Sequence, residues 1–263
     1  MAEITKEQEE YFDAYSCERL KNNINNQEEI KRFVNNKNTN IVNYFIEKAW
    51  EEDARGDVAY YVIKYNNEII FFFSLKCGSL FDPLNEEELI ERKKFLAKIS
   101  DSTKKRQIRK YLQTTKKIKH SLELDKQKEL NRDIYRVGST YAGIELVHFC
   151  KNLNVKDNLT LPCLNHTLGE VLFWKFIVPI ILKVQDSIGC KYIFLFAADS
   201  TENELLITYY RETLKFRQAE DISTSKPIYD FNCMFMCQSL SDLKENQKQC
   251  FENFNPDPDD QIV

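Results

Sequence analysis

The sequence lacks a hydrophobic run long enough to span a bilayer. Its longest apolar stretch, Val171–Leu182, contains Lys175 and Pro179 and falls short of the roughly 20 residues that a membrane-spanning helix needs. The first residues are polar and acidic, so we expect no secretory signal. The eight cysteines lie mostly in apolar runs, which is typical of free buried thiols in a cytoplasmic protein.

An excess of positive charge is also missing. The net charge is −4, so no global basic field favours nucleic-acid binding. The charge is uneven, because residues 84–136 hold 16 Lys and Arg against 9 Asp and Glu, a net of +7 that leaves −11 elsewhere. Many of these basic residues cluster within 104–119. Three interpretations stay open: a helical hairpin with solvated basic faces, an arm that contacts phosphate or RNA, or a surface for a partner protein.

Periodic apolar residues run through the first third of the chain. We expect residues 1–54 to be helical, with a core-facing helix from 41 to 50 that ends near Gly56. The β-branched and aromatic runs at 58–65 and 68–76 are separated by Asn66-Asn67, a pair that tolerates positive φ. They predict a hairpin with a two-residue turn. Helical spacing then predicts a helical insertion after this hairpin.

The chain is organised around residues 142–216. Two β-rich runs, at 143–150 and 191–198, alternate with helical segments at 168–176 and 203–215, which predicts a βαβα unit with parallel strands. Ligands of such units usually bind at the carboxyl ends of the strands, where a loop leads into a helix amino terminus. We place the candidate site there.

The predicted fold class is α+β, with a mixed sheet and helices on both faces. A final strand is expected within 229–237, because the residues there alternate loosely. We expect a single domain over 1–240, in which 84–136 forms a basic helical insertion. Residues 241–263 are expected to form an acidic tail whose proline-rich end is disordered.

Two motifs resemble those of the GNAT N-acetyltransferases. The stretch 164–172 places Gly169 and Leu172 at matching positions of that family's Gln/Arg-x-x-Gly-x-Gly/Ala-x-x-Leu loop, although Leu164 and Thr167 replace its first conserved residues. The stretch 203–210, followed by Leu214-Lys215-Phe216, is similar to the family's Asn-x-x-Ala-x-x-x-Tyr and Leu-Gly-Phe, with one residue inserted. The resemblance covers about 41–240. It implies a sheet that splays between its fourth and fifth strands to admit acetyl-CoA.

On this resemblance we expect an acetyl-CoA-dependent N-acetyltransferase that passes the acetyl group directly to an amine of unknown class. Backbone N–H groups at a helix amino terminus would hold the CoA pyrophosphate. Tyr210, or its neighbour Tyr209, would protonate the departing thiolate, because a phenol is a proton donor at neutral pH. The CoA contacts that we expect are Phe149, Cys150, Leu168, Gly169, Glu170 and Asn203.

The general base is a further expectation. Direct attack needs a neutral amine, so a carboxylate or a water chain must accept its proton. Strict alternation puts Glu145 and His148 on opposite faces of their strand, with His148 on the face of Leu146 and Cys150. Glu145 is the candidate base, since the family often uses a carboxylate on this strand. A surface or salt-bridged Glu145 is the alternative.

Two rival interpretations concern the site as a whole. His148, Cys150, Cys163 and His166 are soft ligands within nineteen residues and could bind zinc, but their spacing is not that of common zinc fingers, so we expect no metal. The other rival is a GNAT-shaped binding or regulatory module that has lost catalysis. The replaced residues at 164 and 167 keep that possibility open.

Overall fold

The computed structural model describes residues 4–81, 140–154, 166–198, 203–219, 222–224 and 233–251. These residues fall into two compact units, of which the small one contains residues 80, 81, 140 and 222–224. There the short strand β6 (Ser223–Thr224) pairs antiparallel with Leu80 and Phe81. The predicted insertion at 84–136 and its basic cluster lie outside the described residues. Among the described residues, no helix combines the length and the apolar character needed to cross a bilayer.

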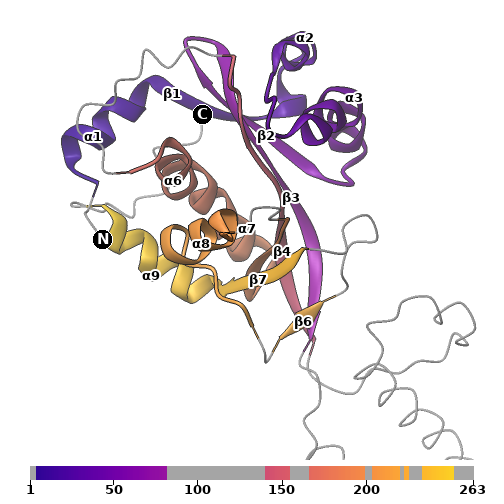
Figure 1. Ribbon diagram of the computed structural model, residues 1–263. Coiled ribbons are helices and arrows are strands. Elements are labelled where there is room, and N and C mark those ends of the chain that lie inside the picture. The colour runs from indigo at the N-terminus through magenta and orange to yellow at the C-terminus, as the bar shows by residue number, and fades with distance from the viewer. Residues whose placement is uncertain are drawn as a thin grey trace, which may run out of the picture. The chain divides into compact units, whose positions relative to one another are not determined.

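The larger unit is built on a mixed sheet with the strand order β1-β2-β3-β4-β5-β7 (Figure 1). The strands are β1 (Tyr15–Arg19), β2 (Ala59–Tyr65), β3 (Glu68–Phe81), β4 (Thr140–Lys151), β5 (Tyr192–Ala197) and β7 (Met234–Ser239). β2 pairs antiparallel with both β1 and β3, and β7 pairs antiparallel with β5. β4 and β5 are parallel, as the sequence predicted.

The hairpin of β2 and β3 turns at the predicted residues. Asn66 and Asn67 have φ values of 50° and 64°. Asparagine tolerates this left-handed conformation better than most residues, and two such residues in succession match the right-handed twist of a hairpin. The preceding helix ends at Gly56, whose φ of 80° closes its last turn. Both predictions are confirmed.

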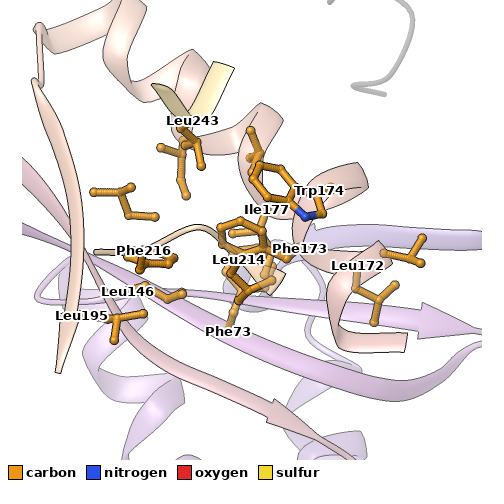
Figure 2. Close-up of a cluster of buried hydrophobic side chains, with 14 of the residues drawn as sticks. Phe73, Leu146, Leu172, Phe173, Trp174, Ile177, Leu195, Leu214, Phe216 and Leu243 are labelled. Carbon is orange, nitrogen blue, oxygen red and sulfur yellow. The ribbon is translucent and has the colours of Figure 1, made fainter. Parts of the chain in front are cut away.

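Helices cover both faces of the sheet (Figure 1). On one face lie α2 (Asn26–Glu29) and α3 (Thr39–Arg55). The hydrophobic core on this face contains Phe45 of α3, Tyr60 of β2 and Phe72 of β3. On the other face lie α1 (Lys6–Tyr11), α6 (Leu168–Leu172), α7 (Val178–Ile188), α8 (Leu205–Thr208) and α9 (Leu240–Cys250). Figure 2 shows the apolar cluster on this second face, in which Phe173 and Trp174 pack against Phe216 and Leu243. Single 3₁₀ turns occupy Phe12–Ala14, Leu20–Asn22 and Ile30–Arg32.

One long helical segment runs from Leu168 to Ile188, well beyond the predicted end at residue 176. It is formed by α6, a π-helical turn over Phe173–Ile177, and α7. The wider turn leaves the Trp174 carbonyl without its usual α-helical donor, because the N–H of Val178 bonds to Phe173 instead. Gln247 Nε2 from α9 donates to the Trp174 carbonyl at 2.8 Å. The irregular turn is therefore stabilised from outside the helix.

Two predictions about the chain ends were wrong. Residues 1–54 are not wholly helical, because β1 pairs with β2 and its Tyr15 ring packs 4.8 Å from that of Tyr65. Residues 240–250 are not a tail but the helix α9. The Ser239 hydroxyl caps α9 by accepting a hydrogen bond from the Asp242 N–H at 3.0 Å. Residues 252–263, which include the proline-rich end, lie outside the described residues.

Candidate functional site

The two parallel strands at the centre of the sheet share only a short stretch of pairing. Gly143–Glu145 of β4 pair with Tyr192–Phe194 of β5. Beyond that stretch β5 continues to Ala197 beside β7, whereas β4 continues to Lys151 beside β3. The strands thus part after the pair Glu145–Phe194, at their carboxyl ends. A sheet that opens there offers unpaired backbone to a ligand.

β4 is irregular where it leaves β5. Ile144, Leu146 and Phe149 all belong to the core on the α6 and α7 face, so strict alternation fails between Leu146 and Phe149. His148 accordingly lies on the α3 face with Cys150, not on the face of Leu146. Glu145, flanked by Ile144 and Leu146, points to that same α3 face. The prediction that Glu145 and His148 face opposite sides was therefore wrong.

Glu145 is the last residue of β4 that pairs with β5. Its carboxylate is partly buried, and this burial raises its pKa, while the charge of Lys76 on β3 opposes the rise. A carboxylate with a raised pKa is a stronger base than one in water. Its place at the fork of the sheet and its electrostatics both suit a proton acceptor.

The first turn of α6 packs closely against a tyrosine. Thr167 caps this turn, and its hydroxyl accepts a hydrogen bond from the Glu170 N–H at 3.3 Å. A Cβ atom at Gly169 would lie 2.9 Å from the Tyr209 hydroxyl and 3.5 Å from the ring of Phe149. Only glycine leaves room for the Tyr209 hydroxyl without a shift. The glycine therefore has a packing role, whatever its role toward a ligand.

Two polar side chains flank the same turn. His166 Nδ1 lies 3.1 Å from Glu170 Oε1, and their side chains are only 6% and 8% exposed. Among the described residues, His166 Nε2 finds no hydrogen-bond partner, although it is buried. The Tyr209 hydroxyl interacts with the Thr167 hydroxyl, which accepts a hydrogen bond from the Glu170 N–H and still has its own O–H to donate. The sequence analysis considered His166 only as a zinc ligand; its i, i+4 spacing from Glu170 was the signal that it overlooked.

Tyr209 and Tyr210 begin a second π-helical turn, Tyr209–Thr213, which directly follows α8. A π-helical turn holds one residue more than an α-helical turn, which accounts for the residue inserted before Leu214. Lys215 then takes a φ of 63°, the conformation that the glycine of Leu-Gly-Phe would adopt readily. A lysine thus adopts here the left-handed conformation that a glycine favours.

The two tyrosines point to different neighbours. The Tyr209 hydroxyl lies against Gly169, as above, whereas Tyr210 packs on Phe216 with ring centroids 6.2 Å apart. Burial raises the pKa of both phenols, so both stay protonated at neutral pH.

The other predicted site residues are distributed as follows. Phe149 packs on Phe71 and lies beside Gly169. Cys150 is buried in the core below α3, and Asn35 Nδ2 donates to its sulfur at 3.5 Å. Asn203 is exposed just before α8. Of the rival zinc constellation, His148 and His166 have other partners and Cys163 lies outside the described residues.

His148 occupies a closed aromatic site. Ser74 Oγ lies 2.7 Å from its Nδ1, and the rings of Tyr44, Tyr60 and Phe72 surround it. Tyr44 and Tyr60 both bond through their hydroxyls to the carboxylate of Glu52. Burial lowers the pKa of His148 to about 4, and the charge of Glu52 opposes this only weakly. The histidine is neutral in the folded protein and packs among these aromatic rings.

This environment predicts a pH-dependent stability. The unfolded chain binds a proton at His148 near pH 6.5 but the folded protein only near pH 4, so the free energy of unfolding should fall as the pH drops between these values. His148 alone contributes at most about 3 kcal/mol to this fall in the free energy of unfolding. Urea denaturation at pH 7.5, 6 and 5 should show this loss, and His148→Gln should reduce it. Parallel profiles for the two proteins would contradict it.

Several solved structures have a fold similar to that of this chain. A structure of AtaT complexed with acetyl-methionyl-tRNAfMet superposes with a TM-score of 0.51 at 9% identity, covering 88% of this chain and 98% of that one. AtaTR bound with AcCoA gives 0.50 at 11% identity over 89% and 98%. A mutant of KacT, in which phenylalanine replaces a tyrosine, gives 0.50 at 11% identity over 88% and 98%.

At such identities the likeness establishes the fold and nothing finer. No protein-family model and no curated protein matches the chain by sequence. The mixed sheet with helices agrees with these structures. The protein has the fold of the GNAT N-acetyltransferases.

Proposed function

We propose that the protein transfers an acetyl group from acetyl-CoA to an amine by direct attack, without a covalent enzyme intermediate. The observation that carries this proposal is the parting of β4 and β5 immediately after Glu145. The start of a long helical segment and a pair of tyrosines lie beside the same strand. In a protein of the same fold, AtaTR, a structure contains AcCoA.

The residues around α6 fit the phosphate end of CoA. The first N–H groups of the helical segment from Leu168 have no partner within the helix and carry partial positive charge. Phosphate binds well where such donors converge. The acyl end of the molecule would then reach the opening beside Glu145.

The proposed chemistry divides between two side chains. Acetyl-CoA supplies the thioester, whose carbon–sulfur bond breaks as the amine nitrogen bonds to the carbonyl carbon. Glu145 accepts the proton that the amine loses, directly or through water, and burial favours this because it raises the pKa of Glu145. Tyr210 donates its proton to the sulfur as the thiolate leaves. Its buried phenol is protonated at neutral pH, as this step requires.

Within this function we propose that the acceptor amine is carried on RNA. Two observations support an RNA-borne acceptor. The segment 84–136, which lies outside the described residues, carries +7 in a chain that is −11 elsewhere, a local field that suits a polyanion. AtaT, a protein of the same fold, has a structure in complex with acetyl-methionyl-tRNAfMet.

The test is to offer labelled acetyl-CoA with three acceptors: small amines, peptides and total aminoacyl-tRNA. We expect acetylated aminoacyl-tRNA, with turnover that falls steeply between low and physiological salt. Reversing Lys104, Lys105, Arg106 and Lys110 to Glu should abolish transfer to tRNA and spare any transfer to small amines. Equal losses on both acceptors would exclude an RNA arm. Acetyl-CoA binding without transfer to any acceptor would favour the non-catalytic module instead.

A further inference from the structure

We propose that Phe194, Phe196 and Phe235 form a surface that binds a large apolar side chain of the acceptor. The preferred acceptor is then an aminoacyl group with an aromatic or long aliphatic side chain, and not a glycyl group. The proposal rests on the proposed function and names the acceptor that its site selects. It gives a role to three aromatic rings that the proposed chemistry does not use.

The three rings lie on the face of the sheet that carries Glu145. Glu145 of β4 pairs with Phe194 of β5, and residues paired in neighbouring strands project from the same face. Phe196 follows two residues later on β5 and pairs with Phe235 of β7, so these two rings project from that face as well. Leu195, between the two phenylalanines of β5, belongs to the core on the α6 and α7 face, as alternation requires.

The rings form one cluster. The ring centroid of Phe194 lies 6.2 Å from that of Phe196 and 6.0 Å from that of Phe235, and the last two are 5.9 Å apart. Among the described residues, the two cores on either side of the sheet contain none of these three rings. The cluster is therefore separate from both cores, and three rings at these distances can contact one aromatic or aliphatic side chain together.

One ring of the cluster is anchored and two are accessible. Phe194 is only 2% exposed, and its ring reaches over β4 to Gly78 of β3, where a Cβ atom would clash with it. The absence of a side chain at Gly78 therefore makes room for the ring. Phe196 and Phe235 are partly exposed. Phe196 also lies on the part of β5 that continues beyond the fork of the sheet.

This position suits the side chain of an aminoacyl acceptor. The amine must reach the opening beside Glu145, the residue to which we assign its proton. In an aminoacyl group the amine nitrogen and the side chain are bonded to the same carbon, so the side chain must lie next to that opening. An apolar side chain that packs on Phe196 and Phe235 leaves water, which favours its binding. A glycyl group gains nothing there.

Acceptors that differ only in their side chain test the proposal. One tRNA charged with phenylalanine, leucine or glycine provides them, with labelled acetyl-CoA as the donor. We expect the parent protein to prefer the phenylalanyl to the glycyl acceptor roughly 10- to 100-fold in kcat/KM. Phe196→Ala and Phe235→Ala should each reduce this preference roughly 5- to 10-fold. Phe196→Leu keeps an apolar side chain and should lose less.

The matched control is Phe176→Ala. Phe176 is also partly exposed, but it lies in the π-helical turn and packs against the core on the other face of the sheet. The same truncation there should affect the phenylalanyl and glycyl acceptors equally. A loss of the preference in this variant would mean that the preference does not arise from the aromatic cluster.

Calorimetry gives a readout that needs no turnover. Phenylalaninamide and glycinamide carry the two side chains on the same kind of amine, and CoA in place of acetyl-CoA prevents transfer. We expect phenylalaninamide to bind the CoA-saturated parent protein more tightly than glycinamide does. Phe235→Ala should remove most of that difference. Equal or undetectable binding of both amides would overturn the proposal.

The outcomes separate this proposal from the proposed function. Acetylation of all three aminoacyl-tRNAs at equal rates would overturn the aromatic surface and leave the acetyltransferase intact. Equal losses on all three acceptors in Phe196→Ala and Phe235→Ala would assign the rings to the RNA or to the fold, and would overturn it too. If no acceptor is acetylated, the proposed function fails and the binding of the two amides decides this proposal alone. Melting temperatures identify any variant that does not fold.

Discussion

Replacing Tyr210 with phenylalanine should lower kcat about 100-fold and change acetyl-CoA affinity little. The substitution removes only the phenolic oxygen, so the packing of the ring on Phe216 is retained. Without the proton donor, the thiolate must leave unprotonated or take a proton from water. Steady-state kinetics with acetyl-CoA and the acceptor identified above provide the measurement. Normal turnover by this variant would place the acid elsewhere.

The matched variants are Tyr209→Phe and Glu145→Gln. Tyr209→Phe should spare kcat, because its hydroxyl lies against Gly169 at the start of α6, where we place the phosphate end of CoA. Glu145→Gln should remove the acidic limb of the pH–rate profile, which the raised pKa of Glu145 sets, while Tyr210→Phe should leave that limb in place. A profile that Glu145→Gln does not alter would exclude this carboxylate as the base.

Gly169→Val should abolish CoA binding and destabilise the fold by about 1–3 kcal/mol. Its Cβ would come within 2.9 Å of the Tyr209 hydroxyl, and its methyl groups would crowd the ring of Phe149. Displacing Tyr209 from α6 disrupts the turn on which we place the phosphate. Calorimetry with CoA and urea denaturation measure the two effects separately.

A double-mutant cycle tests the cause of the Gly169 effect. Gly169→Ala adds only the Cβ, and Tyr209→Phe removes the one atom that this Cβ would approach too closely. The destabilisation by Gly169→Ala should therefore be smaller in the Tyr209→Phe background than in the parent protein. If the two changes in unfolding free energy add exactly, the close contact between the new Cβ and the Tyr209 hydroxyl is not the cause of the destabilisation. An unchanged CoA affinity of Gly169→Val would remove this turn from the site.

The sequence predicted those elements whose signals are local. Asn66-Asn67 fixes the hairpin through two residues that accept positive φ, and Gly56 ends α3 for the same reason. The match around Tyr210 also used local spacing, and its assignment of Tyr210 as the proton donor stays a prediction. The inserted residue before Leu214 was visible, but its accommodation in a π-helical turn was not.

Elements that depend on distant partners were missed. Tyr15–Arg19 has no strong strand pattern and becomes a strand because β2 offers an unpaired edge. The irregularity of β4 places His148 on the face of α3, which period-two reasoning cannot detect. The pairing of Tyr209 with Gly169 joins residues forty positions apart. α9 is different, because its signals are local. Ser239 as a helix cap and the three-residue spacing of Leu240 and Leu243 were signals for a helix that the sequence analysis overlooked.

A crystal structure with bound CoA is the measurement that tests the central claim most directly. The account predicts the thiol in the opening between β4 and β5 just beyond Glu145, with the Tyr210 hydroxyl within hydrogen-bonding reach of the sulfur. It predicts the pyrophosphate on the first turn of α6, bonded to the backbone N–H groups at its amino terminus. CoA bound at another place on the protein, or no binding by crystallography and calorimetry alike, would contradict it.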